Sequence, residues 1–307
     1  TNKSTHNTKQ LDKMSKNILG LFYMLVSVTF FSLMDVCVKL TGEYALGEIL
    51  FFRSLFGFLP IFFLIPKDRL KNFYKTQKIG LHLWRSLFGA TAMASIFIAL
   101  RNLELAETVA MTFAGPIFVT LFSIFFLSEK VGLTRWSAVI LGFIGVIFIS
   151  RPGFETANIF YIFPIIFCLG FATVCILIRK LTLCGESVWL IAFYFTLVSG
   201  LCGLATLPFG GWLMPTKIDF ILLILIGLFG SVANILLTVS YKLAEVSLTT
   251  PLKYLALVYA IAFGFFIFQE IPSSYTIFGA GLVVISSLII FTRERQLKKV
   301  VVMPRQQ

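Results

Sequence analysis

Long apolar runs dominate this chain and most restrict how it can fold. Charges, prolines and glycines divide it into ten apolar segments of 18–24 residues. A helix of about 20 residues is long enough to cross the hydrocarbon core of a bilayer, which is about 30 Å thick. We therefore predict an all-α membrane protein with ten transmembrane helices. The predicted spans are residues 17–40, 46–66, 79–101, 105–127, 133–150, 156–179, 187–209, 218–241, 246–268 and 274–292.

The composition leaves no room for a separate soluble domain. Of the 307 residues, 58% are apolar and 13% are charged, whereas soluble domains carry about 25% charged residues. Because the cysteines form no CxxC pair and lie near no histidine cluster, neither a disulfide framework nor a metal site is expected. These cysteines, predicted to be packing residues, are Cys37, Cys168, Cys175, Cys184 and Cys202.

The basic residues predict the orientation in the membrane. The net charge of +12 comes from 26 Lys and Arg residues, most of which flank apolar runs, so membrane orientation explains them better than nucleic-acid binding. With the N-terminus in the cytoplasm, 19 lie on the cytoplasmic side, four lie outside, and three lie within spans. This bias predicts an inner (plasma) membrane protein with cytoplasmic tails at 1–16 and 293–307. The first span is too long for a cleaved signal peptide.

The two halves of the chain are related by a constant offset. Shifting the sequence by 141 residues without a gap aligns Leu87-Phe88-Gly89 with Leu228-Phe229-Gly230 and Glu129 with Glu270. The shift maps five spans onto five, so the second copy enters the membrane upside down. We therefore predict two inverted five-helix repeats, at 17–152 and 153–292. Inverted repeats are typical of alternating-access transporters, whose substrate site lies near the midplane between the repeats.

Several segments resemble the EamA type of drug/metabolite transporter. They include the small-residue and Thr-rich fourth span with Pro116, FLSEK at 126–130, and their counterparts at 244–272 and 279–291. FFSLMDVCVKL at 30–40 is similar to a branch that includes bacterial S-adenosylmethionine uptake carriers. The resemblance implies a metabolite carrier with its cavity between the repeats. The chain departs from that branch at Lys253, where an arginine is expected.

Ionisable residues within spans are the first candidates for the site, because a charge at the centre of a span costs about 2.5–3.5 kcal/mol. Arg53 and Lys253 are expected to face a substrate carboxylate, and Asp35 a substrate amine or sulfonium. Alternatively, Arg53 snorkels to the interface, and Asp35 pairs locally with Lys39 at i+4. Arg85, beside Trp84, is interpreted as an interfacial anchor.

Polar and aromatic residues extend this list of candidates. Tyr254, Thr112 and Asn234 are expected to contact the substrate, although helix packing explains such residues equally well. Pro116 and Pro251 are expected to bend their helices and contribute to gating. Three glutamates stand at predicted helix starts, where a carboxylate favours the positive end of the helix dipole. They are Glu104, Glu107 and Glu245.

The motifs exclude several other classes of function. The chain has no GxxxxGK[ST] loop for ATP, no HExxH or GxSxG motif of an enzyme, and no ring motif of a channel. We predict a secondary transporter of an amino acid or an S-adenosylmethionine-like zwitterion, with an exporter or exchanger of another metabolite, such as an organic anion, as the alternative. The expected partners are the substrate, the bilayer, and a coupling proton or counter-substrate. No cofactor and no nucleic acid are expected, and a functional monomer is favoured over an oligomer because one chain contains both repeats.

Overall fold

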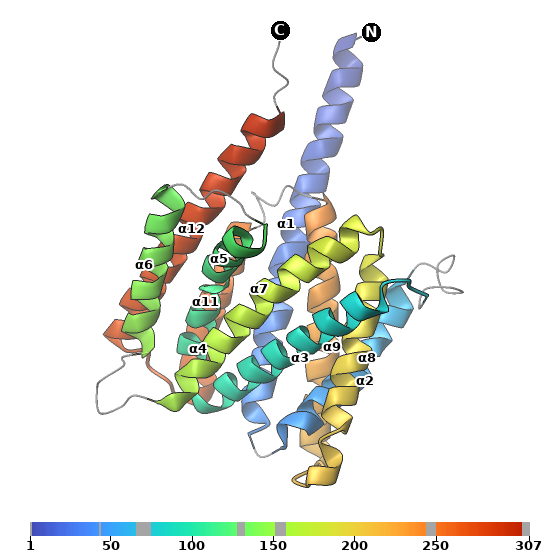
Figure 1. Ribbon diagram of the computed structural model, residues 1–307, viewed down its shortest axis with the longest axis vertical. Helices are drawn as coiled ribbons and strands as arrows, with labels where there is room; N and C mark the ends of the chain where they lie inside the picture. The colour runs from blue at the N-terminus through green and yellow to red at the C-terminus, as the bar shows by residue number, and fades with distance from the viewer. Residues whose placement is uncertain are drawn as a thin grey trace.

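The computed structural model describes residues 2–42, 44–65, 75–127, 133–150, 158–243 and 250–302, and all of its regular elements are helices (Figure 1). In the first half these are α1 (Asn2–Leu40), α2 (Leu46–Leu64), α3 (Ile79–Asn102), α4 (Leu105–Thr112), α5 (Gly115–Leu127) and α6 (Leu133–Ser150). In the second half they are η2 (Ile159–Tyr161), α7 (Ile162–Leu183), α8 (Val188–Leu204), η3 (Leu207–Phe209), α9 (Lys217–Leu243), η4 (Thr250–Tyr254), α11 (Leu255–Phe268) and α12 (Ser274–Val302).

The described helices account for the predicted spans. Six are long and apolar enough to cross a membrane, and four shorter apolar helices complete the set. The shorter ones are Leu105–Val119, Trp136–Ser150, Leu252–Phe268 and Ser274–Ile289. The predicted all-α, ten-span fold is confirmed. The helix α1 begins at Asn2, so the polar segment before the first span continues the same helix.

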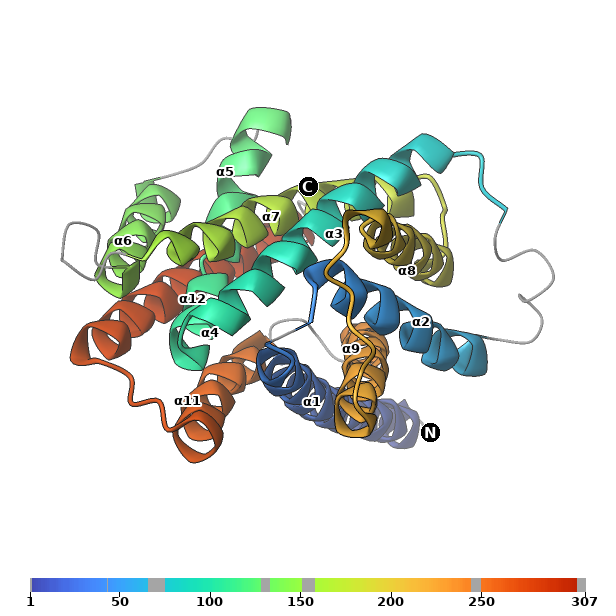
Figure 2. The same ribbon diagram turned by 90° about the horizontal axis from the view of Figure 1, so that it is seen from below.

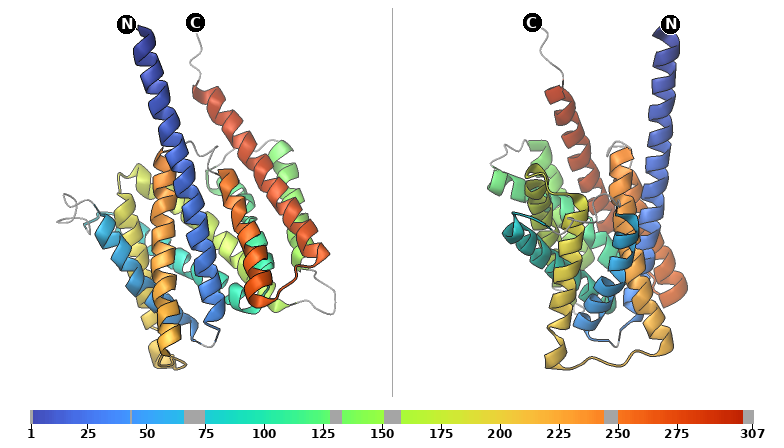
Figure 3. Two further views of the ribbon diagram at one scale, coloured as in Figure 1. Left: turned by 180° about the vertical axis from the view of Figure 1, so that it is seen from behind. Right: turned by 90° about the vertical axis from the view of Figure 1, so that its right-hand side faces the viewer.

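The two halves have opposite directions in the bundle. Both termini lie at one end, and α1 starts at that end whereas α7 starts at the other (Figure 1). Contacts between helices of different halves occur in equivalent pairs. The contact of α1 with α9 corresponds to that of α7 with α3, and the contact of α2 with α9 corresponds to that of α8 with α3. Helices at equivalent positions also pack on each other, α2 on α8 and α6 on α12 (Figures 2 and 3).

The fourth span is broken in the middle. The helix α4 ends at Thr112, and α5 begins at Gly115 with Pro116 as its second residue. Proline has no N–H to donate to the carbonyl four residues earlier, which here is that of Thr112. The Cys168 thiol lies 3.5 Å from the Met111 carbonyl oxygen and 3.8 Å from that of Thr112. A buried cysteine therefore lies within hydrogen-bond distance of two carbonyls at the break.

The ninth span begins irregularly at the equivalent place. Its first described turn is the 3₁₀ helix η4, which contains Pro251, and the α-helix starts only at Leu255. Leu255 is 141 residues after Ala114, which lies in the turn between α4 and α5. The fourth span of each repeat is thus irregular at this equivalent place. The rings of Phe113 and Tyr254, equivalent under the same offset, contact each other at 5.0 Å between centroids.

Glycines bring α6 and α12 into close contact. A Cβ atom on Gly145 would lie 2.7 Å from the Gly279 carbonyl oxygen, and one on Gly279 would lie 2.6 Å from the Gly145 carbonyl oxygen. Both distances are too short for any side chain. Small residues of this kind allow membrane helices to pack backbone to backbone.

Candidate functional site

A cavity of about 460 Å³ lies between helices of both halves. It is lined by Arg53 and Ile61 of α2, Arg85 of α3, Ile178 of α7, five residues between Trp189 and Thr196 of α8, and seven between Gly230 and Val239 of α9. Arg53 and Gly230 lie near the middle of their helices, whereas Ile61, Arg85 and Trp189 lie toward the ends near the termini. The cavity therefore extends from the middle of the bundle toward the end that holds both termini.

Two arginines of the first repeat share one aromatic ring of the second. The guanidinium carbon of Arg85 lies 4.2 Å from the centroid of Phe195, and that of Arg53 lies 5.7 Å from it. Both arginine side chains are buried, with 8% of each residue exposed. Contacts of this kind contribute about 2 kcal/mol or more where the cation is desolvated. Phe195 thus holds two cations at one wall of the cavity.

Some N–H groups of the two guanidinium groups are without a hydrogen-bond acceptor in the part of the chain that the structure describes. Among the described residues, Arg53 Nε, Arg85 Nε and Arg85 Nη1 have no hydrogen-bond partner. The described lining also contains no carboxylate. An unpaired arginine inside a membrane protein is costly, by about 2.5–3.5 kcal/mol on insertion scales. Two of them in one cavity are typical of a site and not of lipid-facing packing.

The repeated LFG triplet explains why the arginines fit. A Cβ atom on Gly89 would lie 2.9 Å from the ring of Phe195 and 3.5 Å from Arg85 Nη1. A Cβ atom on Gly230 would lie 3.4 Å from Arg53 Nη2. The glycines of both triplets therefore leave room beside an arginine of the cavity. Gly89 and Gly230 are therefore equivalent in sequence position and also in how they pack.

Polar groups along α9 complete the lining. Ser231 and Thr238 use their hydroxyls to donate to the carbonyls of Gly57 and Asn234, at 2.9 Å each. Asn234 also lines the cavity, and a side-chain amide can both donate and accept a hydrogen bond. Trp189 adds an aromatic wall toward the termini end. Most of the remaining lining is aliphatic.

The structure brings some of the predicted site residues together and not others. Arg53 and Asn234 line the cavity, but Asp35, Lys253 and Tyr254 do not. Lys253 lies in the 3₁₀ helix η4. Asp35 is half-buried on α1. Tyr254 packs on Phe113.

Three further predicted residues lie at the helix breaks. The Thr112 hydroxyl donates to the Val109 carbonyl at 2.7 Å, within its own helix. Pro116 lies in the first turn of α5, and Pro251 is the second residue of η4. The structure therefore places both prolines where a missing N–H has the least effect on a helix.

Arg85 and Phe195 are the site residues that sequence reasoning missed. The interpretation of Arg85 as an interfacial anchor is wrong, because the residue is buried and lines the cavity, whereas its neighbour Trp84 is exposed. The four-residue spacing of Arg85 and Gly89 could have indicated that Arg85 is buried. Residues at i and i+4 share a helix face, so this pair predicts an arginine that folds along a groove made by a glycine.

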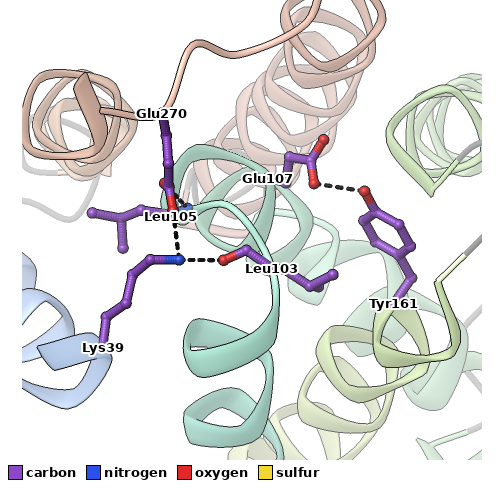
Figure 4. Close-up of polar contacts among 6 residues, drawn as sticks. All are labelled: Lys39, Leu103, Leu105, Glu107, Tyr161 and Glu270. Atoms are coloured by element: carbon purple, nitrogen blue, oxygen red, sulfur yellow. Dashed lines mark hydrogen bonds and ion pairs between the residues drawn. The ribbon is translucent and has the colours of Figure 1, made fainter. Parts of the chain in front are cut away.

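The opposite end of the bundle is tied by an ionic cluster, drawn in Figure 4. Lys39 at the end of α1 forms an ion pair with Glu270 after α11, with Nζ 2.7 Å from Oε1, and donates to the carbonyl of Leu103. The other oxygen of Glu270 accepts from the backbone N–H of Leu105 at 2.8 Å. We call Lys39, Glu270, Leu103 and Leu105 the end clasp. The expected local pair of Lys39 with Asp35 is replaced by this pairing between repeats.

Further contacts hold the same end. Glu107, in the first turn of α4, accepts from the hydroxyl of Tyr161 at 2.6 Å and from that of Thr276 at 2.8 Å. Tyr44 donates to Asp219 at 2.8 Å. Glu107 thus stands at a helix start, as predicted, and also bridges to two segments of the second repeat. Glu104 is the N-cap residue of α4 without a side-chain capping bond, while Glu129 and Glu245 lie outside the described residues.

Comparison with known proteins gives the family. The sequence profile of the EamA-like transporter family matches residues 18–151 and again residues 158–292. The chain is 27% identical over 287 residues to an S-adenosylmethionine uptake transporter of Rickettsia bellii, across 93% of this chain and 97% of that one. It is 25% identical over 281 residues to the pseudopaline exporter of Pseudomonas aeruginosa, across 91% and 96%.

A solved crystal structure supports the fold independently of close sequence similarity. It is 17% identical to this chain, with a TM-score of 0.58 over 92% of this chain and 99% of the other. The family profile matches both halves of a multi-pass, all-helical bundle whose halves pack as inverted repeats. The chain therefore belongs to the EamA-like transporter family, a family of small-metabolite carriers and not of enzymes.

Proposed function

We propose that this chain is a secondary transporter that moves a small zwitterionic metabolite, an amino acid or an S-adenosylmethionine-like compound, across the inner membrane by alternating access. One observation carries the proposal. The cavity lies between both repeats on one side of the middle of the bundle, while the end clasp ties the other side. A substrate held there faces one side of the membrane only, as alternating access requires.

The charge bias along the sequence predicts which side of the membrane the cavity faces. If both termini are cytoplasmic, the end clasp lies outside and the cavity opens toward the cytoplasm, so the structure represents an inward-facing state. The units that move against each other are then the two repeats, 17–152 and 153–292. A coupling proton or a counter-substrate supplies the energy, since the sequence has no loop for ATP.

The zwitterion assignment combines the lining with the relatives. Arg53 offers a positive group to a carboxylate, and Asn234 offers an amide that can both donate and accept. The Rickettsia relative takes up S-adenosylmethionine, which carries a carboxylate, an amine and a sulfonium. Asp35 and Lys253 lie outside the lining in this state. In the proposed cycle they meet the substrate only after the repeats have moved.

The alternative is an exporter or exchanger of an organic anion. The absence of any carboxylate from the described lining favours it, because such a lining offers nothing to a substrate cation. The Pseudomonas relative is an exporter, so membership of the family is compatible with either direction.

Counterflow in proteoliposomes tests the proposed function. Vesicles with the purified chain and a saturating internal load of unlabelled S-adenosylmethionine should accumulate labelled external S-adenosylmethionine transiently, with saturable kinetics. Parallel vesicles loaded with amino acids or with organic anions identify the substrate class. Accumulation driven only by organic anions would support the alternative. A flux that grows linearly with concentration and shows no counterflow would contradict a carrier of any kind.

A further inference from the structure

We propose that Arg53, Arg85 and Phe195 form a subsite for the anionic head group, a carboxylate or a phosphate, of the transported molecule. The proposal deepens the proposed function, because it names the part of the substrate that the cavity recognises and the residues that recognise it. It adds Arg85 to the binding residues and gives Phe195 a positioning role between two cations.

The geometry supports binding by two guanidinium groups at once. Both groups lie over the same ring, at 4.2 and 5.7 Å from its centroid, and each comes from a different helix of the first repeat. The ring attracts the cations through its face, which leaves N–H edges available. Three of those nitrogen atoms have no partner among the described residues. Guanidinium edges match the paired oxygens of a carboxylate or phosphate better than any other side chain does.

The electrostatics require an anion from outside the protein. The two guanidinium carbons lie 5.7 and 4.2 Å from the same ring centroid, so the two positive charges are close to each other. Like charges in a water-poor cavity repel strongly, because the effective dielectric constant is low there. No Asp or Glu belongs to the described lining. A bound anionic head group removes this repulsion, and the largely apolar remainder of the cavity, including Trp189 and Ile235, accepts the organic part of the same molecule.

Trp189 allows the charge of the cavity to be measured without transport. In a full-length variant with Trp84→Phe, Trp136→Phe and Trp212→Phe, Trp189 is the single tryptophan. Iodide should quench its fluorescence about tenfold more strongly than in the same chain with Arg53→Gln and Arg85→Gln, because a charged cavity concentrates counter-ions. Neutral acrylamide should quench both chains equally, which shows that the cavity is intact. Equal iodide quenching would overturn the proposal.

Matched ligands then test recognition of the head group. S-adenosylmethionine is compared with its decarboxylated derivative, and adenosine monophosphate with adenosine, by titration of Trp189 fluorescence. In at least one pair the anionic member should bind about tenfold or more tightly, and Arg85→Gln should abolish that difference. Lys217→Gln, at the exposed start of α9 outside the cavity, should preserve it. Arg85→Lys keeps the charge and should restore part of it. Equal affinities within both pairs would overturn the proposal.

The two proposals fail separately. If counterflow is absent while iodide quenching depends on the two arginines, the transport proposal is wrong and the anion subsite stands. If counterflow is present while the arginine variants keep the affinities and quenching of the parent, the transport proposal stands and the anion subsite is wrong.

Discussion

At the residue scale, the site depends on glycines as much as on charges. Gly89 and Gly230 occupy equivalent positions in the two repeats, and each leaves space beside one arginine of the cavity. Glycine is present here because its Cβ is missing and not because the backbone requires a positive φ. The repeat therefore preserves a packing feature whose consequence is the position of a guanidinium group.

Replacing Gly89 with Ala should weaken substrate binding. The added methyl group would lie 2.9 Å from the Phe195 ring, so the ring must shift and both arginines lose part of their support. We expect an increase of about tenfold in the half-saturating substrate concentration, equal to about 1.4 kcal/mol. The measurement is counterflow in proteoliposomes. Gly80→Ala on the same helix, where no other described part of the chain lies within 4 Å of the added group, is the control. Equal effects of the two substitutions would show that the position of the ring is unimportant.

Arg53 and Asn234 could be predicted as residues of the cavity, whereas Arg85 and Phe195 could not, and the reason is physical. Arg53 lies well inside its span with apolar neighbours, so the cost of burying its charge predicts a site. Arg85 lies six residues after the start of α3 beside an exposed tryptophan, a position that snorkelling explains equally well. Its burial depends on Phe195, 110 residues later in the sequence. Local patterns contain no information on that contact.

At the element scale, the end clasp joins helices of different repeats. Lys39 belongs to α1, Glu270 follows α11, and Leu103 and Leu105 flank the start of α4. The four-residue spacing suggested Asp35 as the partner of Lys39. In the folded chain Glu270 lies closer to the Lys39 ammonium and forms the ion pair instead. In the proposed alternating-access cycle these segments separate, so the clasp is suited to stabilise the state described here.

Breaking the clasp should shift the population toward the opposite state. Glu270→Gln removes the charge that holds Lys39 and leaves a partly buried cation without its partner. Spin labels at the exposed residues Asn102 and Ile271 should then show a longer distance component by pulsed electron paramagnetic resonance. Lys39→Arg, which keeps the ion pair, is the control and should keep the short component dominant. An unchanged distance distribution in Glu270→Gln would mean that the clasp does not contribute to the closure.

The glycine contact between α6 and α12 should matter for stability. Gly279→Val places a side chain against the backbone of Gly145, where even a Cβ atom is 2.6 Å from the carbonyl oxygen. Overpacking of this kind costs about 1–3 kcal/mol, so the unfolding temperature in detergent should fall. Gly281→Val, two residues later with no atom within 4 Å of the added group, should change it little. A similar loss in both variants would indicate an effect of helix propensity and not of packing.

At the scale of the whole molecule, symmetry holds for the helices but not for the charges. The residues equivalent to Arg53 and Arg85 in the second repeat are Tyr194 and Ile226. Helix order, spans and the inverted arrangement could be predicted because apolar runs and the 141-residue offset are properties of the whole chain. The complete lining of the cavity could not be predicted, because its two arginines have no counterparts under the offset. The two positive charges of the cavity lining therefore come from the first repeat alone.

The orientation of the molecule gives the last prediction. If the charge bias sets the topology, both termini face the cytoplasm and the loop with Met214, which is 96% exposed, faces outward. Cysteines introduced at Asn2, Met214 or Gln306 in a chain without its native cysteines should react differently with a membrane-impermeant maleimide. In intact cells only Met214→Cys should be labelled, and in inverted membrane vesicles only Asn2→Cys and Gln306→Cys. The reverse labelling pattern would contradict the orientation predicted by the positive-inside rule. It would place the end clasp on the cytoplasmic side and make the described state outward-facing.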